Sequence, residues 1–413
     1  MLISGICLSD DEAFMSMNGD CRYPAVAVEE NSVFLTWLFT EVRPRAVYFQ
    51  RSIDEGRTWN DARRISRENG DCMPPSIAVN SGIIHLAWID CGEVIDGAMC
   101  YTRSFDGGDT WEKERILLDD ANSAQYPLIS CDGSNVYMIW QDVETKVFVK
   151  ASHDKGQTWE EEILLGEVGK HSCYCFPPAL SVNGNDLIVV WSDFRDEKKD
   201  LKKKFFGFSS SKSDVDTRIS SVVCRRSNDS GRTWSKEYIL TSNRVSKEMT
   251  GEIDNPTMFS NGSRLYLFWL DKHRVPLGEI LYIGFDPAKE EGPIIGKTLF
   301  PDPKRSPRCP SVVFDNNRNL HLTWTSFFGS RSIVHYGAID PEGNILKEKK
   351  DLTSNVERYE NPIITRTSSG LLHIFWFSKP VDRKEWARIF LKTSSDNGLT
   401  WESRGSQKED VQK

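Results

Sequence analysis

Four charged residues stand two positions before a proline, and their side chains are the ones best suited to chemistry. They are Arg22, Asp254, Arg308 and Glu360. An arginine guanidinium presents parallel N–H donors that match the two oxygens of a carboxylate. Tyr359 stands directly before Glu360, and a carboxylate beside a phenol can draw off its proton to make a nucleophile or a base. These positions predict a site for a ligand that carries acid groups.

Three equivalent positions elsewhere carry uncharged residues, Met73, Gln125 and Phe176. Gln125 and Phe176 would add an amide and an aromatic face to the site, which suits the ring of a sugar. The four charged residues alternate in sign when they are taken in the order Asp254, Arg308, Glu360, Arg22. A self-satisfied girdle of salt bridges would show the same alternation. The ligand site and the girdle remain open as alternatives.

A second set of acidic residues follows a repeated tryptophan by two positions. Aspartate is common where a strand ends and a turn begins. Four carboxylates around one rim are also a set that can bind Ca²⁺. We predict no resident metal and keep Ca²⁺ as the alternative. The four residues are Asp90, Asp142, Asp193 and Asp271.

These positions recur because the chain repeats a unit that runs from a proline to a tryptophan. Seven copies align, among them YPAVAVEENSVFLTW at 23–37 and PPSIAVNSGIIHLAW at 74–88. In each copy the proline lies 13 or 14 residues before the tryptophan. Successive tryptophans are 51 to 55 residues apart, except for one gap of 78. They are Trp37, Trp88, Trp140, Trp191, Trp269, Trp324 and Trp376.

An octet of the form Ser-x-Asp-x-Gly-x-Thr-Trp follows five of these tryptophans. Its aspartate can accept hydrogen bonds from its own turn, and its glycine can adopt a left-handed backbone conformation. The octet places no nucleophile beside a base, so we interpret it as a structural hairpin turn. Units five and six keep only Asp286 and Asp340 of the pattern. The octets are SIDEGRTW (52–59), SFDGGDTW (104–111), SHDKGQTW (152–159), SNDSGRTW (227–234) and SSDNGLTW (394–401).

Each unit reads as four short strands, the first starting at the proline and the second ending at the tryptophan. Four-stranded units of this length are the period of β-propeller blades. The sequence therefore predicts an all-β fold, a seven-bladed β-propeller of four-stranded antiparallel blades. In such a blade the first strand starts, and the second ends, on the face opposite the octet turn. The residues before each proline and after each tryptophan would then surround one mouth.

The octets resemble the Asp boxes, or BNR repeats, of the sialidase superfamily, and the resemblance covers nearly the whole chain. It implies that the octets are structural turns on the face opposite the active site. Cys21-Arg22-Tyr23-Pro24 resembles the family's Arg-Ile-Pro motif, whose arginine grips the substrate carboxylate. Arg308-Cys309-Pro310 has the same form. Sialidases usually have six blades, so seven units point to a seven-bladed relative.

The resemblance also implies catalytic roles. Tyr359 with Glu360 resembles the family's tyrosine nucleophile and its glutamate partner. Asp193 has the local appearance of the acid/base aspartate, although it stands in the fourth unit and Phe39 takes the usual place in the first. The predicted catalytic residues are therefore Tyr359, Glu360 and Asp193. The predicted substrate-binding residues are Arg22, Arg308, Asp254, Phe176 and Gln125.

We predict a single propeller domain over residues 1–405 and a disordered tail at 406–413. The polar chain after Trp401 shows no fourth strand, whereas LISGICL at 2–8 is strand-like. We therefore expect this N-terminal strand to complete the last blade and close the ring, which would leave no exposed sheet edge. An insertion at 196–217 carries a lysine run and three phenylalanines and would overhang the mouth. It reads either as a lid or as a solvated loop.

Charge and composition argue against several classes of partner. The net charge of −8 disfavours nucleic acid. No stretch approaches the roughly 20 apolar residues needed to cross a membrane, and the N-terminal stretch lacks the basic start of a signal peptide. The ten cysteines show no paired metal spacing. We expect a cytoplasmic protein with reduced thiols, and its oligomeric state stays open.

Two functions from different classes fit these residues. The first is a sialidase-like carbohydrate-active enzyme for an acidic glycan, either a glycoside hydrolase of sialidase type or a polysaccharide lyase. A lyase needs a neutralised carboxylate and a base, which Arg308 or Arg22 and Tyr359 would supply. The second is a non-catalytic propeller that binds a glycan or a protein, because the fold alone does not decide function.

Overall fold

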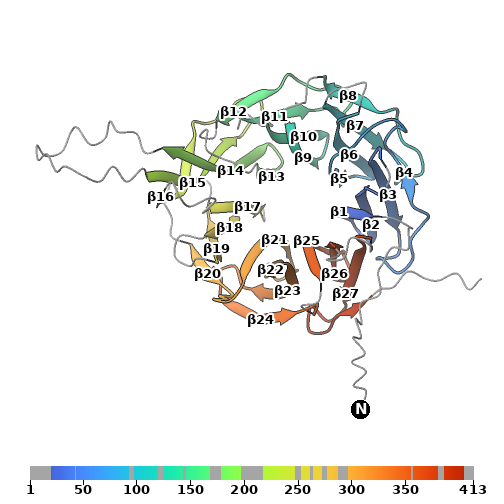
Figure 1. Ribbon diagram of the computed structural model, residues 1–413. Helices are drawn as coiled ribbons and strands as arrows, with labels where there is room; N and C mark the ends of the chain where they lie inside the picture. The colour runs from blue at the N-terminus through green and yellow to red at the C-terminus, as the bar shows by residue number, and fades with distance from the viewer. Residues whose placement is uncertain are drawn as a thin grey trace, which may run out of the picture. The chain divides into compact units, whose positions relative to one another are not determined.

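The computed structural model of the 413-residue chain describes most of the sequence, with gaps (Figure 1). The described residues are 20–41, 43–92, 97–119, 124–142, 146–167, 178–196, 217–246, 253–260, 264–271, 277–286, 296–354, 357–379 and 386–403.

The fold is all-β, a seven-bladed β-propeller, as the repeat predicted. The described residues form 28 strands and no helix, and hence no helix that could span a membrane. The strands make seven four-stranded antiparallel sheets, each built from consecutive strands of the chain. We number these blades one to seven in chain order.

The blades fall into two compact units. The first unit contains blades one, two, six and seven, and the first strands of these blades lie side by side (Figure 1). Its strands are β1 (Cys21–Glu29), β2 (Ser32–Phe39), β3 (Ala46–Ser52), β4 (Arg63–Arg64), β5 (Ser76–Asn80), β6 (Ile83–Asp90), β7 (Ala98–Ser104), β8 (Arg115–Leu118), β21 (Ser306–Phe314), β22 (Leu320–Phe328), β23 (Arg331–Ile339), β24 (Ile345–Asp351), β25 (Arg358–Arg366), β26 (Leu372–Lys379), β27 (Ile389–Ser394) and β28 (Glu402–Ser403).

The second unit contains blades three, four and five, within residues 123–303. The strands that flank the predicted insertion run into it, because β14 continues to Asp196 and β15 starts at Thr217; residues 197–216 lie outside the described residues. The strands are β9 (Ala124–Asp132), β10 (Asn135–Asp142), β11 (Lys146–Ser152), β12 (Ile163–Glu167), β13 (Ala179–Asn183), β14 (Asp186–Asp196), β15 (Thr217–Ser227), β16 (Tyr238–Ser246), β17 (Ile253–Ser260), β18 (Leu265–Asp271), β19 (Glu279–Phe285) and β20 (Lys297–Leu299).

The two ends of the described chain meet in the first unit. The Cys21 amide donates to the carbonyl of Ala387 at 2.9 Å, and the Ala387 amide donates to Asp20 Oδ1 at 2.6 Å. The predicted N-terminal strand at 2–8 and the tail at 406–413 lie outside the described residues, so the clasp and the 1–405 domain stay predictions. The chain after Trp401 does form a short fourth strand, β28, which the polar sequence did not predict.

The repeated tryptophans fill the interior of the blades. Each closes the second strand of its blade, and all seven are between 0% and 3% exposed. The apolar second strands read as near-continuous buried runs, because both faces of a blade pack against neighbouring blades. The positions that recur every 51 to 55 residues are therefore the positions that hold the fold together.

All five octets close the same hairpin turn. In the second octet the Thr110 amide donates to Asp106 Oδ1 at 2.8 Å, and the Thr110 hydroxyl donates to Oδ2 at 2.5 Å. The Ser104 hydroxyl donates to Asp106 Oδ1 at 2.8 Å and accepts from the Gly108 amide at 2.8 Å. The carboxylate is thus used up within its own turn, which supports a structural rather than a catalytic role.

Each octet also packs on the preceding blade. The Trp111 ring meets Phe49 of blade one edge-on, with centroids 5.1 Å apart, and Trp401 meets Tyr336 of blade six at 4.9 Å. In the second unit Trp234 packs with Tyr137 and Leu187. The octet is therefore a clamp between neighbouring blades as well as a turn.

We expect the stability of the protein to fall as the pH drops from about 4 toward about 2. Hydrogen bonds from the Thr233 hydroxyl and amide and from Ser227 lower the pKa of Asp229 to about 2, against about 3.9 in an unfolded chain. A depressed folded pKa stabilises the fold above the unfolded pKa and is lost as pH falls through the folded one. Urea unfolding at several pH values should show a smaller acid loss in Asp229→Asn, and an unchanged pH dependence would contradict this assignment.

Candidate functional site

The residues before the prolines are positioned by a β-bulge at the start of the first strand. The ladder shifts between Arg22 and Ala25 in β1, and between Arg308 and Ser311 in β21. The same shift follows Glu360 in β25. Proline cannot donate to the ladder, and a bulge bends the strand and re-aims the side chains next to it. The bulge places the three charged residues at one register, on three strands that lie side by side (Figure 1).

Two arginines share one aromatic ring at this edge. The Arg308 guanidinium lies 5.2 Å from the centroid of the Phe327 ring, and the Arg358 guanidinium lies 5.3 Å from it. Phe327 is the penultimate residue of β22, and Arg358 opens β25. Arg358 also forms an ion pair with Glu360, two residues along the same strand. Blades six and seven thus present two cationic groups over one ring.

Blade one contributes a third arginine at the same register. Arg22 pairs with Asp20 at 2.6 Å, and its side chain keeps 27% exposure. Its Nε atom is buried without a hydrogen-bond partner. Asp20 also accepts from the amide of Ala387, beside the half-exposed Trp386. We call Arg22, Arg308 and Arg358 the arginine strip.

The pairs in this strip do not form the predicted girdle of alternating salt bridges. Glu360 pairs with Arg358 on its own strand, and Arg22 pairs with Asp20 two residues away. Arg308 is exposed and makes no ion pair with any carboxylate of the described side chains. A girdle needs Arg308 to bridge to Glu360, and that pair is not formed. Arg308 is therefore left with its charge available.

Tyr359 does not lie where a nucleophile is needed. Its ring is 2% exposed and packs edge-on against Trp376 and Phe390, at 6.5 and 6.1 Å. The buried Ser332 hydroxyl accepts from the Tyr359 amide and donates to its carbonyl, both at 2.6 Å. Because side chains alternate along a strand, a residue next to one that faces the mouth points into the core. The nucleophile role predicted for Tyr359 does not fit this position.

The remaining predicted site residues belong to the second unit. Asp193 is 3% exposed in β14, opposite Ser221 of β15. The backbone of Gln125 pairs with Gln141, and that of Asp254 pairs with Leu270. Phe176 lies outside the described residues. The part of the chain that the structure describes does not bring these four residues together with the arginine strip, so their roles stay predictions.

The aspartates after the tryptophans are engaged in local structure where their contacts are described. Asp90 is fully buried, accepts from the Gly92 amide at 2.9 Å and pairs with Arg67 at 2.6 Å. Asp142 accepts from the Lys146 amide at 2.7 Å. Asp90 also lies near Cys100 and Glu114, three groups close enough to share an ion. The arginine against Asp90 already supplies positive charge there.

Sequence reasoning missed Arg358 and Phe327. Arg358 precedes Glu360 by two residues, so strand alternation alone could have placed both on one face. Phe327 stands at the end of the second strand of blade six, one residue after the rim position occupied by Ser326. Its signal was the pair Phe327-Phe328, two aromatic residues beside a turn, the second of them 62% exposed.

Solved structures share this fold at low sequence identity. An ulvan lyase of polysaccharide lyase family PL25, bound to -[GlcA(1-4)Rha3S]-, aligns with a TM-score of 0.60 at 12% identity, over 92% of this chain and 94% of that chain. The β-propeller domain of the Trilobed protease from Pyrococcus furiosus aligns with a TM-score of 0.54 at 9% identity, over 96% and 99%. An α-L-arabinofuranosidase from Fusarium graminearum, with an iminosugar inhibitor, aligns at 0.50 and 16% identity, over 78% and 92%. No family model and no curated protein matches the sequence.

These neighbours define the chain as a β-propeller of a kind found in both carbohydrate-active enzymes and a protease. A polysaccharide lyase and glycoside hydrolases are among the proteins with this fold. Identities this low show the fold alone, so the function must be argued from the arginine strip and its surroundings.

Proposed function

We propose that this protein is a carbohydrate-active propeller of sialidase type that binds an acidic glycan at the arginine strip. The observation that carries the proposal is Arg308, whose exposed guanidinium stacks on Phe327 without a carboxylate partner among the described side chains. A free guanidinium beside an aromatic ring suits a sugar acid, because the arginine grips the carboxylate or sulfate and the ring faces the sugar.

Two further features support an extended acidic ligand. Arg358 and Arg22 lie on the adjacent blades and continue the positive charge. Phe328 and Trp386, 62% and 41% exposed, add apolar surface at strand ends of the same blades. The ulvan lyase with this fold binds a sulfated saccharide that contains glucuronate. An acidic glycan of that general class is the partner we propose here.

If the protein is an enzyme, Glu360 is the best-placed acid or base. Its carboxylate is held by Arg358 and keeps 16% exposure. In a lyase, Arg308 would neutralise the substrate carboxylate so that Glu360 could remove the neighbouring proton. In a hydrolase, Glu360 would need a second carboxyl group, and Asp20 on the adjacent blade is the candidate.

The alternative is a propeller that binds the glycan without turnover. The burial of Tyr359 favours it, because the only tyrosine predicted as a nucleophile is held in the core by Trp376 and Phe390. Incubation with uronate-containing and sulfated oligosaccharides separates the cases. A hydrolase releases new reducing ends alone, a lyase also produces unsaturated sugar ends, and a binding protein produces neither.

Arg308→Ala should weaken the binding of an acidic oligosaccharide by at least about tenfold, or about 1.4 kcal/mol. The reason is the loss of a charge-assisted contact at a side chain that supports no other described ion pair. Calorimetric titration with a glucuronate-containing, sulfated tetrasaccharide measures the effect, with cellotetraose as the neutral comparison. The melting temperature should stay within about 2 °C of the parent protein, because exposed substitutions cost little.

Lys113→Ala is the matched control, since it removes one exposed cation beside the second octet, away from the strip. It should leave the affinity unchanged. Equal losses in both variants would mean a non-specific charge effect. A large fall in melting temperature without a change in affinity for Arg308→Ala would return the strip to a structural role.

The cytoplasmic location also remains a proposal. It is supported by free thiols at the cysteines whose side chains are described, as expected in a reducing compartment. They are Cys21, Cys72, Cys91, Cys100, Cys131 and Cys224.

A further inference from the structure

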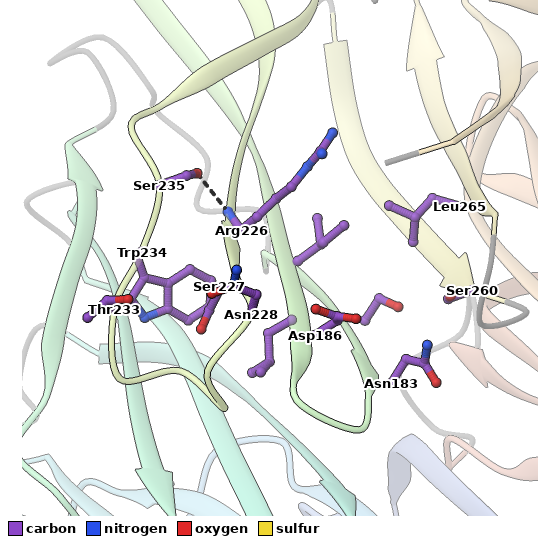
Figure 2. A pocket seen from close by; sticks show the side chains of 13 residues that line it. Asn183, Asp186, Arg226, Ser227, Asn228, Thr233, Trp234, Ser235, Ser260 and Leu265 are labelled. Carbon is purple, nitrogen blue, oxygen red and sulfur yellow. Dashed lines mark hydrogen bonds between the residues drawn. The ribbon is translucent and has the colours of Figure 1, made fainter. Parts of the chain in front are cut away.

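A groove of about 600 Å³ opens in the second unit, between blades four and five. One wall comes from the first three strands of blade four, and the other includes Ser260 and Leu265 of blade five (Figure 2). The floor is apolar, because Leu187, Ile188 and Leu265 are between 0% and 7% exposed. The groove lies beside the fourth octet rather than beside the residues that precede the prolines.

The octet clamp explains why a groove can exist here. In the first unit, Arg51 on the third strand of blade one reaches the octet of blade two. It donates to the carbonyls of Asp106 and Gly107 at 3.0 and 2.6 Å and pairs with Asp109 at 2.8 Å. Blade five carries GFDPAKEEG at 284–292, which lacks the threonine and tryptophan of an octet.

Arg226 is the counterpart of Arg51 in blade four. Arg51 pairs with Phe34, three residues before Trp37, and Arg226 pairs with Ile188, three residues before Trp191. The Arg226 amide donates to Ser235 at 3.0 Å, whereas its guanidinium makes no contact with a described residue. Figure 2 shows this side chain extending toward Leu265 on the blade-five side.

The groove offers acceptors as well as donors. Asp186 lies at the turn between β13 and β14, and its carboxylate accepts no hydrogen bond from a described residue. Asn183 stands at the other end of the same turn (Figure 2). A planar cation, a carboxylate and an amide above an apolar floor match the hydroxyl groups and apolar ring faces of a sugar.

We propose that this groove is a second carbohydrate site, specific for a neutral saccharide. Arg226 donates to sugar oxygens in place of the carbonyls that Arg51 binds, and Asp186 accepts from sugar hydroxyls. The carboxylate of Asp186 disfavours acid groups, so the groove and the arginine strip select different ligands. The site does not depend on the function proposed for the strip.

The test uses the full chain and three neutral hexasaccharides, namely cellohexaose, xylohexaose and maltohexaose, followed by saturation-transfer NMR and calorimetry. At least one should bind, and Arg226→Ala and Asp186→Ala should each weaken it at least tenfold. Arg308→Ala and the surface control Lys236→Ala should leave this binding unchanged. Absence of binding by all three sugars, or binding that ignores both groove variants, would overturn the proposal.

A stability comparison shows whether the chain itself occupies Arg226. Arg51→Ala should lower the melting temperature, because it removes three contacts to the next octet. Arg226→Ala should not, since its guanidinium has no such contacts. Equal losses in the two variants would mean that the protein's own residues fill the groove, and the proposal would fail.

Discussion

Gly398→Ala is expected to lower the free energy of unfolding by about 2–5 kcal/mol, the sum of a backbone cost and an overpacking cost. Gly398 has a φ of 89°, in the left-handed region that favours glycine. A Cβ atom there would lie 1.9 Å from Tyr336 Oη and 2.3 Å from Cζ. Tyr336 cannot easily yield, because it is 1% exposed and its hydroxyl bonds to His321 at 2.7 Å. Urea unfolding measures the loss.

Gly133→Ala is the control for the backbone cost alone. Its φ is 59°, and a Cβ atom there would meet nothing within 4 Å. We expect a loss of about 1–2 kcal/mol. The excess at Gly398 then measures how tightly the last octet clamps onto blade six. If the two variants lose the same stability, the octet turn does not press on the neighbouring blade as the structure shows.

Arg67→Met should destabilise the protein by about 3–5 kcal/mol, the usual cost of breaking a buried pair from one side. Arg67 Nη2 lies 2.6 Å from Asp90 Oδ2, and the Asp90 side chain is 0% exposed. Removal of the guanidinium leaves a buried carboxylate without its partner. Chemical denaturation at pH 7 measures the change in free energy.

The double variant Arg67→Met, Asp90→Asn should recover part of this loss, because the buried charge is removed with its partner. The pH dependence gives a second readout. Without Arg67 the pKa of Asp90 should rise, so the loss in the single variant should shrink as the pH is lowered. Simple additivity of the two substitutions would show that the pair is not coupled. Asp90 would then be open again to the Ca²⁺ role that the rim suggested.

Much of the fold could be predicted from the sequence because its determinants are local and repeated. Asp106, Gly108 and Thr110 satisfy each other within one turn, so the octet specifies its hairpin without help from the rest of the chain. Trp37 and its six counterparts mark the buried end of each second strand. Seven copies of these signals determine the number and order of the blades. The short strand β28 escaped prediction because polar residues at an outer edge carry no hydrophobic pattern.

The candidate site was decided only by the tertiary structure. Arg22, Arg308 and Glu360 were predicted from their places before a proline, and the bulges bring them to one register. Which charges pair, however, depends on side chains from neighbouring blades and on the direction in which each residue points. Strand alternation buries Tyr359 and exposes Glu360, so adjacent residues in the sequence have opposite fates.

Contacts between blades settle the rest. Arg308 meets Phe327 through the pairing of β21 with β22, and Arg358 reaches the same ring from the next blade. The groove beside Arg226 likewise lies between two blades, where no pattern within one repeat could reveal it. A repeated sequence specifies each blade through local hydrogen bonds and buried rings, whereas a binding site arises where side chains of different blades meet. Only the packed structure determines which charges are left without a partner.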